Sequence, residues 1–159
     1  MARIRNPYVY AGPPLGAKEK VRAQDGYTWK SGQLARRDSG VWMPVLSAGT
    51  HVHGIFSDSQ VAATSTSDVY VERITSTQTQ LGVLVSYTDS DYFTKQAFVG
   101  EERGVRVTSN CASLNVQRDT GPVFLIQSRL CDVEPFMNDS TDEPGTFIVT
   151  VLAAALASA

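Results

Sequence analysis

The sequence predicts an all-β protein: a single β-sandwich or small barrel-like domain of about ten short strands, with an extended N-terminal arm. Short apolar runs recur between clusters of Gly, Ser, Asp and Pro, the residues that punctuate strands. No segment shows the apolar spacing of a helix longer than about two turns. We therefore divide the chain into an arm at 1–26, a β domain at 27–152 and a C-terminal tail at 153–159.

Length and composition indicate one ordinary globular domain. The 159 residues are enough to bury a sizeable core. Hydrophobic residues make up 42% and charged residues 19% of the chain, which is typical of globular proteins. No apolar run is long enough for a transmembrane helix, so we expect no membrane contact. No apolar segment follows the basic N-terminal residues, so we expect synthesis and folding in a cytoplasm.

Charge is distributed unevenly along the chain. Residues 1–37 carry eight basic and two acidic residues, whereas the rest of the chain carries six basic and fourteen acidic ones. Such asymmetry is typical of a segment that binds an acidic surface, although ordinary solvated charge gives the same pattern. The net charge of the whole chain is −2, so we expect no direct contact with nucleic acid.

Residues 1–26 have the composition of an extended arm. Pro7, Pro13 and Pro14 each lack a backbone donor and disfavour helix in the preceding residue. The apolar side chains between them need a partner surface. Two interpretations stay open: the arm docks on a neighbouring molecule, or Tyr8–Tyr10 is an edge strand of its own domain. On the first interpretation the partner-binding residues are Arg3, Arg5, Tyr8, Val9, Tyr10, Pro13, Pro14 and Leu15.

Residues 27–56 predict an antiparallel meander around which the domain is organised. Turn signals at 30–32, 38–40 and 48–50 close three short apolar-bearing runs. Each signal contains a glycine, which supplies the positive φ that tight turns need.

Further strands are predicted along the second half of the chain, at 69–74, 80–86 and 104–108. Residues 114–118 and 123–129 flank Gly121-Pro122 and predict a hairpin. Residues 146–152 are rich in β-branched side chains and give the strongest strand prediction. The alanine-rich tail favours helix but is too short to hold one without packing.

His51 and His53 are the candidate metal ligands. Positions i and i+2 of a strand point to one face, so both imidazoles could contact one metal ion. The spacing is similar to the first metal motif of the cupins, which takes a third histidine from a later strand. This chain has two histidines in total, so that site cannot be completed in its usual form. We therefore expect no metal and no other cofactor.

We expect no enzymatic activity. The chain contains no nucleophile elbow and no glycine-rich phosphate loop, and Cys111 and Cys131 lie in no metal-binding spacing. The adjacent acids Glu101 and Glu102 are typical of a solvated turn.

Aromatic residues offer a second kind of candidate site. Tyr27, Trp29 and Trp42 could stack on sugars or bases if they were exposed. More often such residues fill a β core or an interface, because they bury a large area with few rotatable bonds.

Three segments of the central stretch form a series of a strand with a G-x-L turn at 31–36, a strand at 41–45 and a "G-I" strand at 53–56. This series resembles the short head decoration (cement) proteins of tailed bacteriophages. The strands at 69–74, 104–108 and 146–152 are similar to the rest of such a domain. The resemblance covers residues 27–152 and is a pattern of strands and turns. The arm and the acidic segment 132–143 depart from it.

The resemblance implies a virion structural protein that decorates the outside of a phage capsid and stabilises it by bridging neighbouring capsid subunits. It implies the major capsid protein as partner, trimers of this chain, and a place on the capsid exterior after synthesis in the host bacterial cytoplasm. Two alternatives stay open. One is another virion module (tail, spike or adhesin) that binds a host glycan through exposed Trp29 and Trp42. The other is a metal-dependent β-barrel enzyme that uses His51 and His53.

Overall fold

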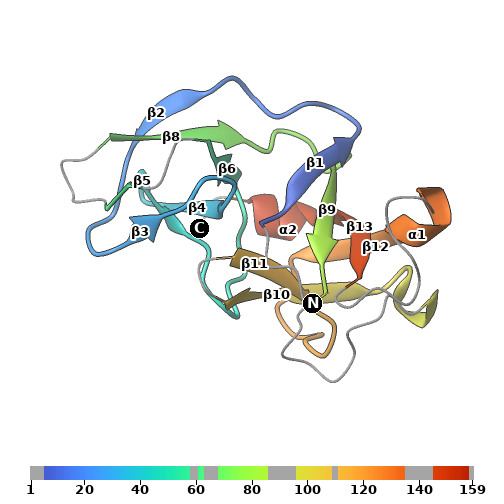
Figure 1. Ribbon diagram of the computed structural model, residues 1–159. Helices are drawn as coiled ribbons and strands as arrows, with labels where there is room; N and C mark the ends of the chain where they lie inside the picture. The colour runs from blue at the N-terminus through green and yellow to red at the C-terminus, as the bar shows by residue number, and fades with distance from the viewer. Residues whose placement is uncertain are drawn as a thin grey trace.

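The computed structural model describes residues 6–57, 61–62, 68–85, 96–108, 111–134 and 145–157, of which 61, 62, 68, 108 and 111 are described by backbone alone. Strands make up 48% of the structure and helices 9%, so the predicted all-β class is confirmed. The strands form two antiparallel sheets that do not close into a barrel, an arrangement consistent with a sandwich (Figure 1).

The larger sheet has six strands in the order β1-β9-β13-β12-β10-β11. An isolated bridge between Val85 and Leu114 brings the β11 edge back to the end of β9, so the sheet is strongly curled. The strands are β1 Tyr8–Ala11, β9 Gln80–Leu84, β10 Glu102–Thr108, β11 Cys111–Asn115, β12 Phe124–Arg129 and β13 Thr146–Val151.

The smaller sheet has five strands in the order β2-β8-β6-β4-β5. It too is curled, because a bridge between Ala23 and Trp42 joins the end of β2 to β5. The strands are β2 Glu19–Arg22, β4 Leu34–Asp38, β5 Val41–Pro44, β6 Gly54–Phe56 and β8 Asp68–Arg73. A separate pair is formed by β3 Thr28–Trp29 and β7 Val61–Ala62, and the short helices are η1 Gln96–Phe98, α1 Leu130–Val133 and α2 Ala153–Leu156.

Two connections differ from the sequence prediction. The β4–β5 hairpin is present, but β6 pairs on the far side of β4, so residues 27–56 are not a simple meander. β11 and β12 are not partners, because β10 lies between them and pairs with both. The predicted hairpin around Gly121-Pro122 is therefore wrong, and that turn connects two non-adjacent strands.

Strands β4 and β6 of the five-stranded sheet contribute to two apolar cores, one on each face. Leu34 and Ile55 point toward the six-stranded sheet and join the larger core. The alternate residues Ala35 and Phe56 point the other way, because successive side chains of a strand lie on opposite faces. The smaller core is completed by Val21, Ala23, Trp29, Trp42, Val69 and Val71.

The N-terminal residues belong to the sheets, so 8–22 is not a separate extended arm. β1 pairs with β9, and β2 pairs with β8. The apolar side chains find their partner surface on the same domain: Leu15 packs on the larger core, and Tyr8 lies over Gly82, where a Cβ would overlap its ring. Of the two interpretations, the edge strand at Tyr8–Tyr10 is the one present.

The C-terminal residues 153–157 are also packed. They form the single-turn helix α2, and Ala155 is buried in the larger core. This contact supplies the packing without which so short a helix is unstable.

β1 is one of the two outer strands of the six-stranded sheet, but it is poorly suited to accept another strand. It has four residues, and its register with β9 shifts between Val9 and Ala11. Pro7 precedes it, and Gly12-Pro13-Pro14 follows it. Short length, irregular register and proline are the features that discourage pairing between sheet edges.

None of the helices within the described ranges has the length and apolar character needed to cross a membrane.

Candidate functional site

The predicted partner-binding residues of the N-terminal segment do not form one cluster. Tyr8 packs over Gly82, and the Tyr10 hydroxyl donates a hydrogen bond of 3.1 Å to Glu134 Oε1. Val9 points outward with 40% of its surface exposed. Pro13 and Pro14 are also exposed, Leu15 is half-buried on the larger core, and Arg3 and Arg5 lie outside the described residues.

Polar contacts fix the N-terminal segment to β8 and its following loop. The Gly16 N–H donates to the Arg73 carbonyl at 2.8 Å, and the Thr79 hydroxyl donates to the Pro13 carbonyl at 2.7 Å. Arg73 holds Glu19 through two hydrogen bonds of 2.8 Å, and this ion pair lowers the pKa of the Glu19 carboxyl. The segment is therefore a rigid surface and not a loose tether.

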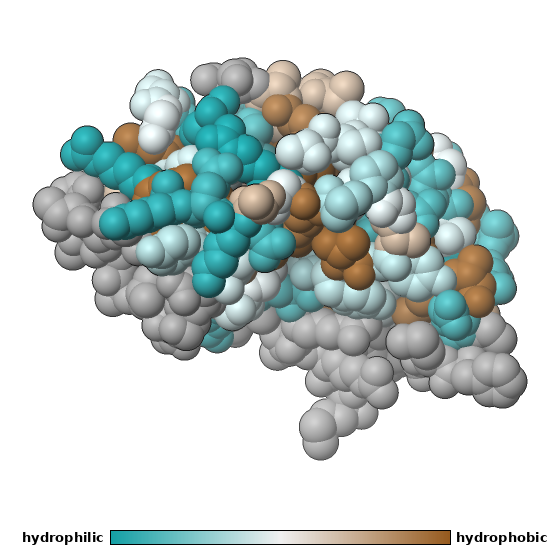
Figure 2. Space-filling model, turned by 90° about the horizontal axis from the view of Figure 1, so that it is seen from above, coloured by the Kyte–Doolittle hydropathy of each residue, from teal (hydrophilic) through white to brown (hydrophobic). Residues whose placement is uncertain are grey.

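Hydrophilic side chains gather over the β2 end of the face formed by β1, β2 and β8 (Figure 2). Hydrophobic side chains appear on the described part of this face in small separate groups. A partner that binds this face would therefore meet mixed polar and apolar contacts, as is typical of the surfaces used by separately folded proteins.

His53 precedes β6, and both of its ring nitrogens are engaged. Nδ1 accepts a hydrogen bond of 2.8 Å from the Arg37 backbone N–H, and Nε2 lies 2.7 Å from the Ala157 carbonyl oxygen. A carbonyl only accepts, so the proton is on Nε2 and the ring is in its neutral form. The neighbouring Val52 N–H donates to the Ala155 carbonyl at 2.9 Å. His53 thus ties α2 to β4.

Burial lowers the pKa of His53 below its ordinary value of 6.5. The positive charges of Arg36 and Arg37 and the neighbouring His51 act in the same direction. The hydrogen bond to the Ala157 carbonyl opposes the shift, because the charged ring would also donate it. The environment therefore favours the neutral ring that the hydrogen bonds require.

His51 lies beside His53 but has a different environment. The two rings are stacked with 5.8 Å between their centroids, and His51 Nδ1 is 3.0 Å from Thr50 Oγ1. A metal at this pair would have only His51 as a histidine ligand, since His53 has no open nitrogen. In the part of the chain that the structure describes, no three His, Cys, Asp or Glu side chains are grouped as a metal site.

The tryptophans are core residues. Trp29 is fully buried and Trp42 is 2% exposed. Trp29 packs on Phe56 with 5.1 Å between ring centroids, and the Arg73 guanidinium covers Trp42 at 5.2 Å. Neither ring is available to stack on a sugar, so the exposed pair that would favour a glycan-binding module is not present.

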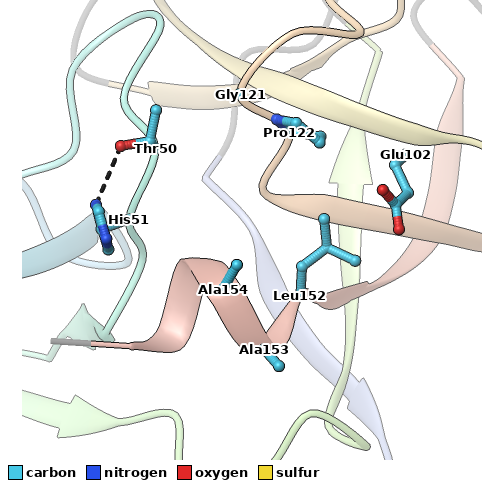
Figure 3. A pocket seen from close by; sticks show the side chains of 8 residues that line it. All are labelled: Thr50, His51, Glu102, Gly121, Pro122, Leu152, Ala153 and Ala154. Atoms are coloured by element: carbon cyan, nitrogen blue, oxygen red, sulfur yellow. Dashed lines mark hydrogen bonds between the residues drawn. The ribbon is translucent and has the colours of Figure 1, made fainter. Parts of the chain in front are cut away.

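A pocket of about 570 Å³ opens beside α2 (Figure 3). Residues 152–154 give it an apolar floor, and Gly121 and Pro122 from the loop before β12 line another side. Thr50 and His51 lie at one end, and Glu102 of β10 lies at the opposite end. The pocket thus combines an apolar surface with a carboxylate at one end and an imidazole at the other.

Sequence reasoning missed this pocket because its walls come from four distant segments. The acids Glu101 and Glu102 were recognised as a pair, but the sequence does not indicate that Glu102, the first residue of β10, lines a cavity. The alanines at 153–154 indicated a preference for helix, and nothing in the sequence indicated that they line a pocket.

Comparison with known proteins assigns no family to the chain: no family model, no curated protein and no solved structure matches it.

Proposed function

We propose that the protein is a virion structural protein that decorates the outer surface of a phage capsid and stabilises it by bridging neighbouring capsid subunits. The supporting observation is that the three segments that carry the resemblance lie next to one another in the fold. The three segments of the sequence series correspond to β4, β5 and β6, which are neighbours in one sheet in the order β6-β4-β5. The series is therefore one structural unit of the domain.

The rest of the molecule is consistent with a role in adhesion. Two cores share one sheet, and the N-terminal segment is fixed to the domain by strand pairing and an ion pair. A rigid body that binds a repeating lattice needs only a modest interface per copy, because many copies act together. The partner in this proposal is the major capsid protein, and copies associate as trimers on the capsid exterior after synthesis in the host cytoplasm.

The experiment is to mix the purified protein with undecorated heads and image the particles. Regular density at symmetry-related positions is the expected result. Heads without added density would reject the capsid role and favour the alternative of a tail, spike or adhesin module.

The contact surface is tested separately with Val9→Glu. Val9 is among the most exposed large apolar residues. If the N-terminal segment forms the interface with the capsid, a charge at this position should weaken binding to heads by about tenfold or more. Leu46→Glu is the matched control, because Leu46 is 46% exposed and lies outside the N-terminal segment. Co-sedimentation measures binding, and circular dichroism checks that both variants fold. Equal binding by Val9→Glu and wild type would place the interface elsewhere.

A further inference from the structure

We propose that the pocket beside α2 binds a lysine or arginine side chain presented by a partner polypeptide. The pocket is a property of the domain alone, so this inference holds whether or not the protein coats a capsid. Its volume of about 570 Å³ is in the range of sites that hold a small ligand or a short peptide segment.

The Glu102 carboxylate is the group that selects charge. It lines the pocket, and among the described residues it forms no ion pair and accepts no hydrogen bond. An unpaired carboxylate at the edge of an apolar surface attracts a cation, and because Glu102 is exposed this attraction is modest and weakened by salt.

The nearby arginines do not satisfy Glu102. Arg103 Nε donates to the Val116 carbonyl at 2.9 Å, and Nη1 donates to the backbone carbonyl of Glu102 at 2.8 Å. Arg118 lies across Gly104, with Nη2 3.4 Å from the Ala48 carbonyl. Arg103 Nη1 also lies 3.5 Å from Glu101 Oε2, and Arg118 Nη2 lies beside Gly121, 3.3 Å from where a Cβ on that residue would be. Neither guanidinium pairs with the Glu102 carboxylate among the described residues, so the acid stays available to a ligand.

The apolar floor of the pocket favours a ligand with an aliphatic segment. Leu152 is half-buried, and Ala153 and Ala154 are exposed, so together with Pro122 they present apolar surface to the pocket. Lysine and arginine carry an aliphatic stem behind a charged head and bury that stem along apolar surface. The combination of apolar floor and terminal carboxylate in Figure 3 is the complement of these side chains.

His51 favours a polypeptide over a free amine. It lies at the end of the pocket opposite Glu102, and its Nδ1 is engaged with Thr50. Nε2 can then donate to or accept from the backbone of a bound segment. A ligand that spans the pocket would use both ends, whereas a small organic cation would use only one.

The test is a titration of the isotope-labelled full chain, followed by NMR of the backbone amides. The probes are acetyl-Ala-Lys-Ala-amide, its norleucine analogue and butylammonium. We expect saturable shifts centred on Glu102, Gly121 and Ala153 for the lysine peptide, with weaker binding of the other two probes and a loss of affinity at high salt. Norleucine peptide binding as tightly as lysine peptide would overturn the charge assignment. Butylammonium binding as tightly as lysine peptide would overturn the assignment to a polypeptide.

Glu102→Gln and Glu101→Gln form a matched pair. The two acids are adjacent and exposed, but only Glu102 lines the pocket. Glu102→Gln should weaken lysine-peptide binding by about two- to fivefold, the effect expected of one exposed ion pair. Glu101→Gln should leave it unchanged. Equal affinities in the two variants would overturn the proposal.

Discussion

The imidazole of His53 supplies a hydrogen-bond acceptor where backbone pairing stops. The last register pair between β4 and β6 is Ala35 with Gly54, and the preceding Val52 turns its N–H toward α2. Without the ring, the half-buried Arg37 N–H would lose this hydrogen bond. The second nitrogen satisfies the Ala157 carbonyl at the end of α2. One neutral side chain thus provides hydrogen-bond partners for two backbone groups, the Arg37 N–H and the Ala157 carbonyl.

The state of His53 predicts how stability depends on pH. Its pKa is lowered in the folded state, so just below pH 6.5 the unfolded chain binds more protons than the folded one. The free energy of unfolding should therefore be unaffected above the ordinary pKa and fall as pH drops through the folded pKa. The lowered pKa values of Glu19 and Asp132 act only at more acid pH, below 4.5 and 3.8 respectively.

Urea denaturation between about pH 5 and about pH 8 measures this dependence. His53→Gln removes the titrating ring and should flatten the profile over this range, at the cost of a lower stability near neutrality. His51→Gln is the control and should retain most of the slope. A wild-type profile that is flat or rises toward acid pH would contradict the assigned role of His53.

At the scale of elements, the β4–β5 hairpin turns through two residues with positive φ. Ser39 has φ +52° and Gly40 has φ +81°, the pattern of the two-residue turn that matches the twist of antiparallel strands. Asp38 and Val41 form the flanking register pair. The turn therefore fixes the register that sends Trp42 into the smaller core.

Substitutions at this turn should change stability through backbone conformation alone. A Cβ at Gly40 would meet no atom within 4 Å, so Gly40→Ala should cost about 1 kcal/mol from the left-handed conformation without any clash. Ser39→Asn should stabilise by a few tenths of a kcal/mol, because Asn adopts positive φ more readily. Chemical denaturation measures both. A neutral Gly40→Ala would show that the turn can change type at no cost.

The sequence predicted the strands that local features determine, such as β-branched runs and turn residues. It did not predict correctly which strands pair with one another. The β-branched run at 146–151 and the turn at 38–41 are determined by their own residues. The position of β6 beside β4, and of β10 between β11 and β12, depends on which apolar faces meet across the sheets. That choice is made by long-range packing, which a sequence pattern of period two does not contain.

The candidate site also combines local features, which the sequence shows, with long-range contacts, which it does not. His51 and His53 were predicted to share one face of a strand, but both precede β6 and lie outside any strand. Their rings do lie together, whereas the partners of His53 lie 16 and 104 residues away in sequence. The apolar side chains at 8–15 were expected to pack against another surface. The sequence left open whether that surface belongs to a neighbouring molecule or to the same domain. Tyr8 over Gly82 favours the same domain, because only glycine leaves room for the ring.

At the scale of the molecule, the two cores share the five-stranded sheet and should unfold together. Both tryptophans lie in the smaller core, so fluorescence reports that part of the domain. Because β4 and β6 contribute to both cores, loss of one exposes the other face of the same strands. We expect fluorescence and far-UV circular dichroism to give one coincident transition, as in a two-state domain.

Val71→Ala in the smaller core and Val149→Ala in the larger core are matched variants, since both side chains are fully buried. Each should cost about 2 kcal/mol and shift the two signals by the same amount. If Val71→Ala moved the fluorescence transition ahead of the circular dichroism transition, the smaller core would be an independent unit.

The irregular β1 edge has a consequence for any setting in which copies are crowded on a repeating surface. A regular edge at such density would template its neighbour and propagate into fibres. The proline-flanked, shifted β1 gives a crowded neighbour no regular ladder to continue at this edge, so contacts made there depend on side chains.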